Sequence, residues 1–420
     1  MPFTPLETLA GGAILHLSTS SLLTSTGRVL GISGIVDGSL LGDNAAWRHA
    51  VVIGLFAGPL IVAATGLDAV VAVPGAGASL WAQQGLVRLS IAGLLVGFGS
   101  RLGSGCTSGH FLCGASRLSP RSLLATAVFF STAVATARLI PAPIAEAPGV
   151  DASAVLLPPA WHVPILAALV GGVAWANAAL TARVLAAGNK APAVVDDYLP
   201  GLDDDEHGRR VRFPPPPPTY PPGAEGRLTP HAYTALQLAP YLLTGVTFSL
   251  GLIVSGMVSP LKVIGFLRFP PPLAGFDPSL ALVFLGGVVP NAVHWRRVVP
   301  VPKLPWEKWR VPSRTELDWR LVAGSLLFGL GWGLAGVCPG PAVVAGSQLS
   351  LNLFSALRSE GVDAVFGTAG KALLGWAAFA DLLVIGMAAA KGFEKAIAAA
   401  GPHVHPKKND DKDVDTQVDH

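Results

Sequence analysis

The chain has 420 residues, of which 51% are hydrophobic and 13% are charged, and its mean hydropathy is +0.53. So few charged side chains cannot cover a water-facing surface of ordinary charge density, which excludes a soluble globular protein and predicts that lipid surrounds most of the chain. The formal net charge is only +3, and the basic residues lie in loops instead of along one stripe, which excludes a nucleic-acid partner.

Apolar stretches long enough to cross a lipid bilayer recur along the whole chain. A transmembrane helix needs about 20 mainly apolar residues, at a rise of about 1.5 Å per residue. In chain order, the clearest such stretches are residues 47–66, 123–140, 163–185, 236–256, 280–295, 321–337 and 373–389. The sequence therefore predicts an all-α fold, a polytopic membrane helical bundle.

The chain also contains two related halves. Residues 88–106, RLSIAGLLVGFGSRLGSGC, align without a gap on residues 320–338, RLVAGSLLFGLGWGLAGVC, and this alignment pairs Cys106 with Cys338. Internal repeats of this kind are typical of transporters, whose substrate site lies near the middle of the membrane where the halves meet. We expect two pseudo-symmetric, inverted transmembrane repeats at residues 1–186 and 231–400.

The segment between the halves, residues 187–230, has a different composition. It holds an acidic run, a basic cluster and the proline run at residues 214–218. Such a segment is too poor in apolar residues to pack, so we interpret it as a polar, proline-rich linker with polyproline character. The Lys- and Asp-rich residues 401–420 are predicted to form a disordered tail.

A stretch of small and polar residues interrupts the first-half apolar segment. The run that begins at residue 89 meets GSGCTSGH at residues 103–110 before hydrophobicity resumes at residue 123. Irregular backbone at membrane depth is tolerated only where protein buries it or a cavity solvates it, because each unpaired peptide group in hydrocarbon costs several kcal/mol. We therefore expect re-entrant half-helices that line a pore.

Both aligned cysteines precede predicted helix starts. Thr107 and Ser108 are good helix caps and follow Cys106, while Pro339 follows Cys338 and suits a first helical turn. A helix N-terminus offers unpaired backbone N–H groups and a partial positive charge, which favour anions. A neutral thiol can donate a hydrogen bond, and its polarizable sulfur suits a soft anion.

Further residues near these breaks are candidates for the same path. Gly105 and Gly340 lack a side chain and are expected to expose backbone to the substrate. His110 lies either at the mouth of the pore or at the cap of a short helix. Arg101, like Arg117 and Arg121, either draws in an anion electrostatically or lies at the membrane interface. Lys262 adjoins an apolar segment, and ionisable groups within membranes are functional hypotheses by default.

Cys113 completes the pattern Cys-x3-His-x2-Cys with Cys106 and His110. Zinc sites usually contain closer cysteine pairs and a fourth ligand, so we predict neither a metal site nor a cofactor. Cys113 is kept as a further candidate for the substrate path.

Two segments carry a resemblance to a known family. Residues 97–122, GFGSRLGSGCTSGHFLCGASRLSPRS, and residues 331–342, GWGLAGVCPGPA, resemble the YeeE/YedE family of sulfur-transport membrane proteins. The resemblance implies two pseudo-symmetric halves, short re-entrant helices that meet near the centre, and thiosulfate uptake with cysteines along the path. Carried onto matching positions, the path cysteines are Cys106 and Cys338.

The resemblance extends to residues 256–267 and to GRVLGISGI at residues 27–35, and it covers nearly everything except the linker and the tail. Thiosulfate-importing members of the family have a third path cysteine near the start of the first half. This chain offers only Ser33 in that neighbourhood. Some members are linked to selenium or to other sulfur compounds, and these substrates stay as alternatives.

The leading hypothesis is transport of a small sulfur-containing anion, thiosulfate first, across a bilayer. The predicted path consists of Ser33, Gly105, Cys106, Thr107, Ser108, His110, Cys338, Pro339 and Gly340. The alternative is a membrane-embedded thiol enzyme that handles sulfane sulfur or disulfide exchange, with the two aligned cysteines as a reactive pair. The sequence has no Cys-x-x-Cys pair and no flavin or quinone signature, so we do not expect an enzyme.

Overall fold

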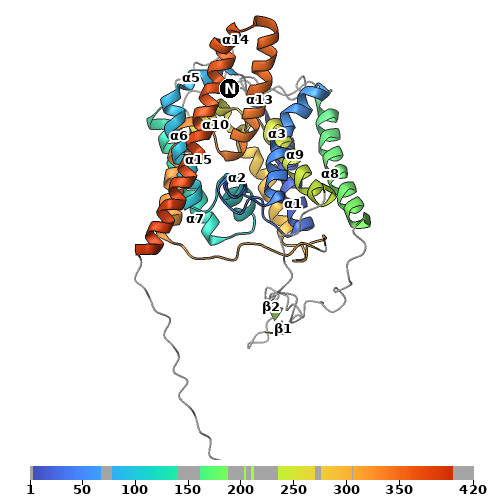
Figure 1. Cartoon of the computed structure of the whole chain (residues 1–420). Coiled ribbons are helices and arrows are strands. Elements are labelled where there is room, and N and C mark those ends of the chain that lie inside the picture. Colours follow the sequence, from blue (N-terminus) through green and yellow to red (C-terminus); the bar gives the residue numbers. More distant parts are fainter. Residues whose placement is uncertain are drawn as a thin grey trace, which may run out of the picture.

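The computed structural model describes residues 3–67, 78–140, 161–187, 203–204, 210–211, 235–269, 276–304 and 306–400. Most of these residues form helices, and the two-residue strands β1 (Asp203–Asp204) and β2 (Arg210–Val211) pair antiparallel. The prediction of a helical bundle is thus confirmed (Figure 1). Most of the predicted linker, residues 187–230, and all of the predicted tail, residues 401–420, lie outside the described residues.

The helices of the first half are α1 (Pro5–Thr26), α2 (Ile32–Leu40), α3 (Ala46–Thr65), α5 (Ala78–Gln84), α6 (Leu86–Leu102), the π-helix η1 (Thr107–Ala115), α7 (Pro120–Leu139) and α8 (His162–Ala187). Those of the second half are α9 (Ala235–Ser255), α10 (Pro260–Leu267), η3 (Pro278–Ala281), η4 (Phe284–Val288), α11 (Val289–Trp295), α12 (Trp319–Ala335), α13 (Pro339–Glu360), α14 (Asp363–Phe366) and α15 (Thr368–Ala400).

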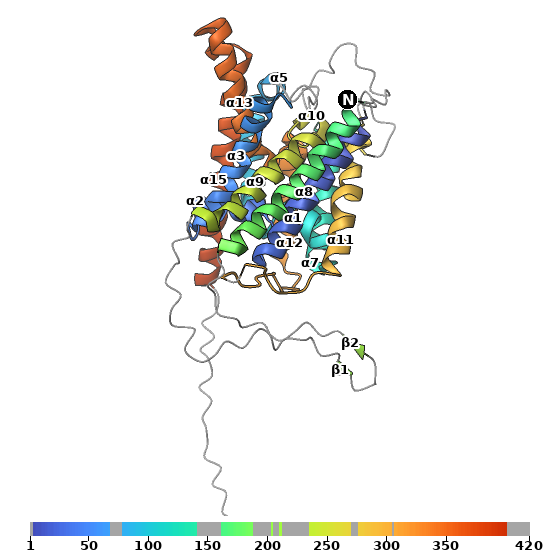
Figure 2. The ribbon, with the colours of Figure 1, turned by 90° about the vertical axis from the view of Figure 1, so that its right-hand side faces the viewer.

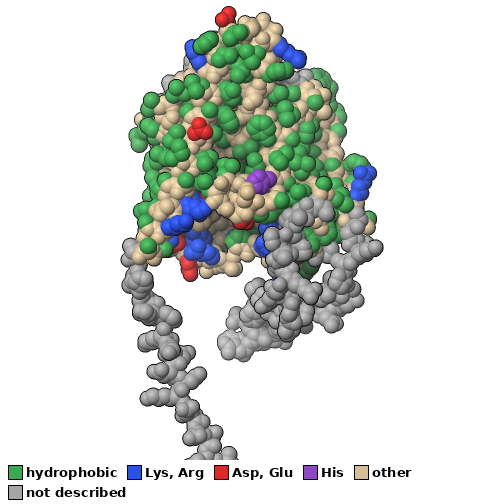
Figure 3. All heavy atoms as spheres, in the orientation of Figure 1, with side chains coloured by type: hydrophobic (Ala, Val, Ile, Leu, Met, Phe, Trp, Pro, Cys, Tyr) green, Lys and Arg blue, Asp and Glu red, His purple; other side chains and the backbone are tan. Residues whose placement is uncertain are grey.

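Seven helical segments among the described residues are long and apolar enough to cross a membrane. Each apolar stretch predicted from the sequence overlaps one of them. Hydrophobic side chains cover most of the face in Figure 3, with most charged side chains near its lower and upper ends. The chain is therefore an integral, multi-pass membrane protein. In addition, α6 and η1 form a helix pair bent by 43° at a short break, which is either a broken span or a re-entrant loop.

Two antiparallel helix pairs join the two halves of the chain. In the first pair, Gly11 of α1 lies against Ser255 of α9, and Leu15 lies against Gly251. Figure 2 shows α8 beside this pair. In the second pair, Gly99 of α6 lies against the backbone of α12, so the backbones approach closely, as small residues permit between membrane helices.

The contacts of α6 and α12 are reciprocal at aligned positions. Gly99 of α6 packs against Phe328 of α12, and the aligned Gly331 packs against Val96 of α6. The aligned glycines Gly97 and Gly329 also make matching contacts, each with a helix outside the α6–α12 pair. Gly97 packs against α15, and Gly329 packs against the backbone of α7. Each of these helices is thus held between its aligned partner and one outer helix.

The segment between α11 and α12, residues 296–318, runs along the lower side of the bundle (Figure 1). The guanidinium of Arg28 forms an ion pair with Glu307 at 3.1 Å, and the Tyr241 hydroxyl donates to the same carboxylate at 2.5 Å. Toward the other end of the segment, Arg117 and Arg121 donate to the backbone carbonyls of Pro312 and Glu316 at 2.7 and 2.6 Å. This segment is therefore tied to both halves.

We predict that Gly99→Ala destabilises the protein by about 1–3 kcal/mol, because the added methyl group has no space against the backbone of α12. The matched control is Gly172→Ala in α8, where nothing lies within 4 Å of the added methyl group. Thermal unfolding in detergent measures both variants. Equal melting temperatures for Gly99→Ala and the wild type would contradict the close packing.

Candidate functional site

A cavity of about 350 Å³ lies between the two halves. Most of its lining is apolar, with phenylalanines from both halves and Trp332. The thiol, hydroxyl and exposed backbone groups in the lining are few. They come from the two helix breaks, at Cys106, Thr107, Ser108, Cys338 and Gly340. A cavity of this size and composition is typical of a binding site for a small molecule.

The two aligned cysteines are the N-cap residues of η1 and α13. Both have extended backbone, and each carbonyl accepts the first bond of its helix, from His110 N–H at 2.9 Å and from Ala342 N–H at 3.0 Å. Both cysteines are free thiols that line the same cavity. The breaks therefore bring one thiol and one helix N-terminus from each half to one space.

Hydroxyl groups of the first half contact both thiols. The Thr107 Oγ1 atom lies 3.4 Å from the Cys338 sulfur, and the Ser108 Oγ atom lies 3.2 Å from the Cys106 sulfur. Ser108 also accepts a hydrogen bond of 3.0 Å from the backbone N–H of Ile32, the first residue of α2. The start of α2 is thus fixed beside the start of η1.

Several predicted path residues support the site from behind the cavity lining. The imidazole of His110 is buried between the Gly103 carbonyl at 3.1 Å and the Ser122 hydroxyl at 3.2 Å, and it lies next to Gly105. Ser33 is buried in α2, one residue after Ile32, which does line the cavity. Pro339 is buried in the first turn of α13.

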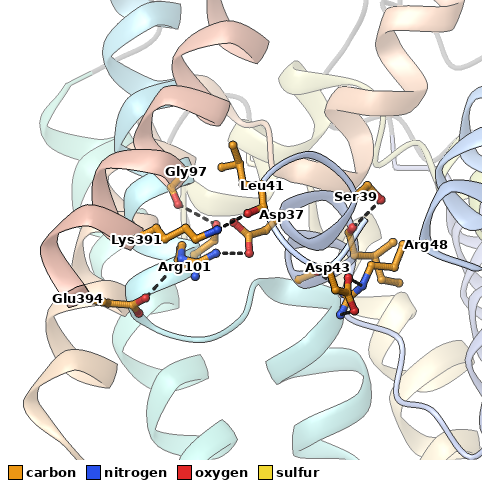
Figure 4. Close-up of polar contacts among 12 residues, drawn as sticks. Asp37, Ser39, Leu41, Asp43, Arg48, Gly97, Arg101, Lys391 and Glu394 are labelled. Carbon is orange, nitrogen blue, oxygen red and sulfur yellow. Dashed lines mark hydrogen bonds and ion pairs between the residues drawn. The ribbon is translucent and has the colours of Figure 1, made fainter. Parts of the chain in front are cut away.

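The further candidates do not line the large cavity. The Cys113 thiol donates to the Leu30 carbonyl at 3.4 Å and lines a separate, much smaller cavity. Arg101 of α6 lies between Asp37 of α2 and Glu394 of α15 and pairs with both carboxylates (Figure 4). These ion pairs join the two halves at the end of α6.

Arg117 and Arg121 donate hydrogen bonds to the backbone carbonyls of Pro312 and Glu316 in the segment between α11 and α12. Lys262 is buried and donates to the Thr4 and Thr8 hydroxyls. Among the residues with described positions, no three His, Cys, Asp or Glu side chains converge as metal ligands.

The sequence analysis did not predict one polar network. Asn291 of α11 lies 2.7 Å from His16 and 2.9 Å from Thr19, both on α1, and donates to the Leu112 carbonyl of η1 at 3.2 Å. One turn further on, His294 lies 3.1 Å from Thr24. The sequence contained one signal for this network. Three positions separate His16 from Thr19, and three separate Asn291 from His294, within apolar segments. This spacing places the two residues of each pair on one face of a helix.

The chain is a membrane-spanning bundle with a cavity at the starts of η1 and α13, where two apolar segments are interrupted. Residues 6–136 match a family described as sulphur transport, and residues 236–359 match a family of unknown function. A probable transporter of Xylella fastidiosa strain Temecula1 is 45% identical over 129 residues, which are 31% of this chain and 90% of that protein. A second probable transporter of the same strain is 38% identical over 130 residues, 30% of this chain and 83% of that protein.

A probable transporter of strain 9a5c is 44% identical over 129 residues, with the same coverage as the first relative. No solved structure matches significantly. Together, the sulphur-transport match and the relatives show that the chain belongs to the YeeE/YedE-like family of sulfur transporters.

We predict that a small anionic methanethiosulfonate modifies Cys338 faster than Cys113, because Cys338 is partly accessible and lines the large cavity, whereas Cys113 is buried against Leu30. Variants that keep a single cysteine isolate each rate, which intact-mass spectrometry measures over time. Faster modification of Cys113 would contradict the placement of the two thiols.

Proposed function

We propose that this protein carries a small sulfur-containing anion, thiosulfate by first choice, across the bilayer through the central cavity. The observation that carries the proposal is the meeting of Cys106 and Cys338, each at a helix start and each from a different half, at one cavity. Membership of a sulfur-transporter family supports the same substrate class.

The lining favours a soft anion that is bound weakly. The helix starts of η1 and α13 supply partial positive charge, and neutral thiols supply weak, polarizable donors. The remaining lining is apolar and cannot replace the water around a strongly hydrated ion. Thiosulfate has a terminal sulfur atom with diffuse charge, so it loses less hydration there than an ion whose outer atoms are all oxygen. Weak binding also suits conduction, which requires release as well as entry.

We propose the following path. The anion contacts the thiols of Cys106 and Cys338 in turn, with the Thr107 and Ser108 hydroxyls and the Gly340 backbone beside them. Gly105, His110 and Pro339 hold the helix breaks in shape, and Ser33 supports the start of α2. The contact between Thr107 and Cys338 supports a passage from one thiol to the other, because it places groups of the two breaks side by side.

The proposed architecture is a pair of inverted repeats, residues 1–186 and 231–400, with re-entrant half-helices at the two cysteine breaks. The antiparallel course of α6 and α12 and the reciprocal contacts of Gly99 and Gly331 support this relation. In such transporters one repeat rocks against the other around a fixed site. The central cavity would then open alternately to the two sides of the membrane.

We predict that Cys106→Ala and Cys338→Ala each lower thiosulfate uptake by about tenfold or more. A hydrogen bond to a charged group contributes about 1.5–3 kcal/mol, and 1.4 kcal/mol corresponds to a factor of ten in rate. The measurement is uptake of radiolabelled thiosulfate into cells, with the amount of membrane-inserted protein determined for each variant. Sulfite, sulfate and selenite serve as competing substrates.

Cys113→Ala is the matched control and keeps the wild-type rate, because its thiol lies outside the central cavity. Wild-type uptake by both cavity variants would remove the thiols from the mechanism. No uptake by the inserted wild-type protein would end the thiosulfate proposal. A persulfide or disulfide trapped by alkylation after substrate addition would instead favour the membrane thiol enzyme.

A further inference from the structure

A buried polar cluster adjoins the central cavity at the N-terminal end of α1. Lys262 of α10 and Asp277, the N-cap residue of η3, are 3% and 0% exposed. Their neighbours Val263 and Leu280 line the cavity. The cluster therefore lies directly behind the wall of the proposed anion path.

Hydrogen bonds connect the members of this cluster. The ammonium group of Lys262 donates to the hydroxyls of Thr4 and Thr8 on the α1 side. The Thr4 backbone N–H donates to the Ser279 hydroxyl at 2.9 Å, and that hydroxyl donates to Asp277 Oδ1 at 2.5 Å. The Ser279 backbone N–H donates to the same oxygen at 2.9 Å. The network thus fixes one oxygen of the Asp277 carboxylate.

Three oxygen atoms of this region are buried and find no hydrogen-bond partner among the residues whose positions are described: Asp277 Oδ2, Glu7 Oε2 and Ser259 Oγ. Ser259 is the N-cap residue of α10, and its side chain is fully buried. Buried polar atoms in native proteins normally have a partner, and an unpaired carboxylate oxygen is among the least favourable exceptions. A carboxylate or hydroxyl oxygen without a donor is a suitable ligand for a cation.

The charge of the cluster leads to the same conclusion. Lys262 interacts electrostatically with both Asp277 and Glu7, so one ammonium group is shared by two carboxylates. The other ionisable side chains on the helix ends around the cluster are Arg268, the C-cap residue of α10, and His162, the first residue of α8. The two carboxylates repel an anion in the neighbouring cavity, and a cation bound beside them weakens this repulsion.

We infer that this cluster binds one small monovalent cation, a proton or a sodium ion, and couples its movement to that of the anion. The inference rests on the proposed transport function. Linkage between the two sites is reciprocal, so the cation strengthens anion binding by the same factor by which the anion strengthens cation binding. Such coupling offsets one of the two charges of a dianion that moves against a membrane potential negative inside, and it adds the driving force of the cation gradient.

The test uses the full-length protein in liposomes, with the membrane potential clamped by potassium and valinomycin. An inward proton gradient and an inward sodium gradient are applied separately while the initial rate of radiolabelled thiosulfate uptake is measured. One of the two gradients accelerates wild-type uptake severalfold and so identifies the cation. Asp277→Asn and Glu7→Gln lose this acceleration but still exchange internal for external thiosulfate.

Asp43→Asn is the matched control. Asp43 pairs with Arg48 at 2.8 Å, and its side chain is 57% exposed, so this variant keeps the response to the gradient. If Asp277→Asn does not assemble, Ser259→Ala takes its place, because it removes an orphaned oxygen without changing the charge. A binding measurement that needs no transport supports the assay: the melting temperature in detergent depends on sodium or pH in the wild type and much less in the variants.

The outcomes separate the two proposals. Thiosulfate exchange by the wild type without an effect of either gradient overturns the cation site and leaves the transport function standing. A response to the gradient that survives in both carboxylate variants also overturns the site. Wild-type protein that shows no exchange at all overturns the transport function and the coupling together.

Discussion

The close antiparallel contact of α6 with α12 determines where the functional groups lie. Each of these helices ends a few residues before a cysteine, so their crossing fixes both helix breaks. Within the breaks, the Gly105 N–H donates to the Ser100 carbonyl at 2.8 Å, and the Gly336 N–H donates to the Trp332 carbonyl at 2.7 Å. Irregular backbone can therefore lie inside the bundle without meeting lipid.

The position of the two helix breaks also explains why the cavity lining contains few polar groups. A backbone that satisfies its own hydrogen bonds leaves few polar groups to face the cavity, and aromatic side chains fill the rest of the wall. On the proposed path, an anion would depend on helix ends and thiols instead of charged side chains. The arginines nearest the first break are already engaged: Arg101 with Asp37 and Glu394, and Arg121 with the Glu316 carbonyl.

Features that depend on local sequence were predictable, and features that depend on distant partners were not. The apolar spans follow from hydropathy, and the start of α13 follows from the proline at its first position. The start of η1 lies where it was predicted, but Cys106 is its N-cap residue and Thr107 and Ser108 lie within its first turn. The partner of His110 is Ser122, but that of Arg117 is Pro312, nearly two hundred residues away. A single sequence gives no signal for the second kind of contact, so it left open whether Arg117 attracts anions or lies at the membrane interface, and it did not predict the bond to residue 312.

The two helix starts are aligned but not chemically equal. Pro339 and Pro341 in the first turn of α13 have no N–H, and the Gly340 N–H is directed at the Cys338 sulfur. The first turn of η1 contains no proline, so Thr107 and Ser108 keep their backbone N–H groups and add two hydroxyls. On the proposed path, an anion would therefore meet more donors at Cys106 than at Cys338. Under that proposal, the asymmetry would favour firmer binding at the first half and easier release at the second.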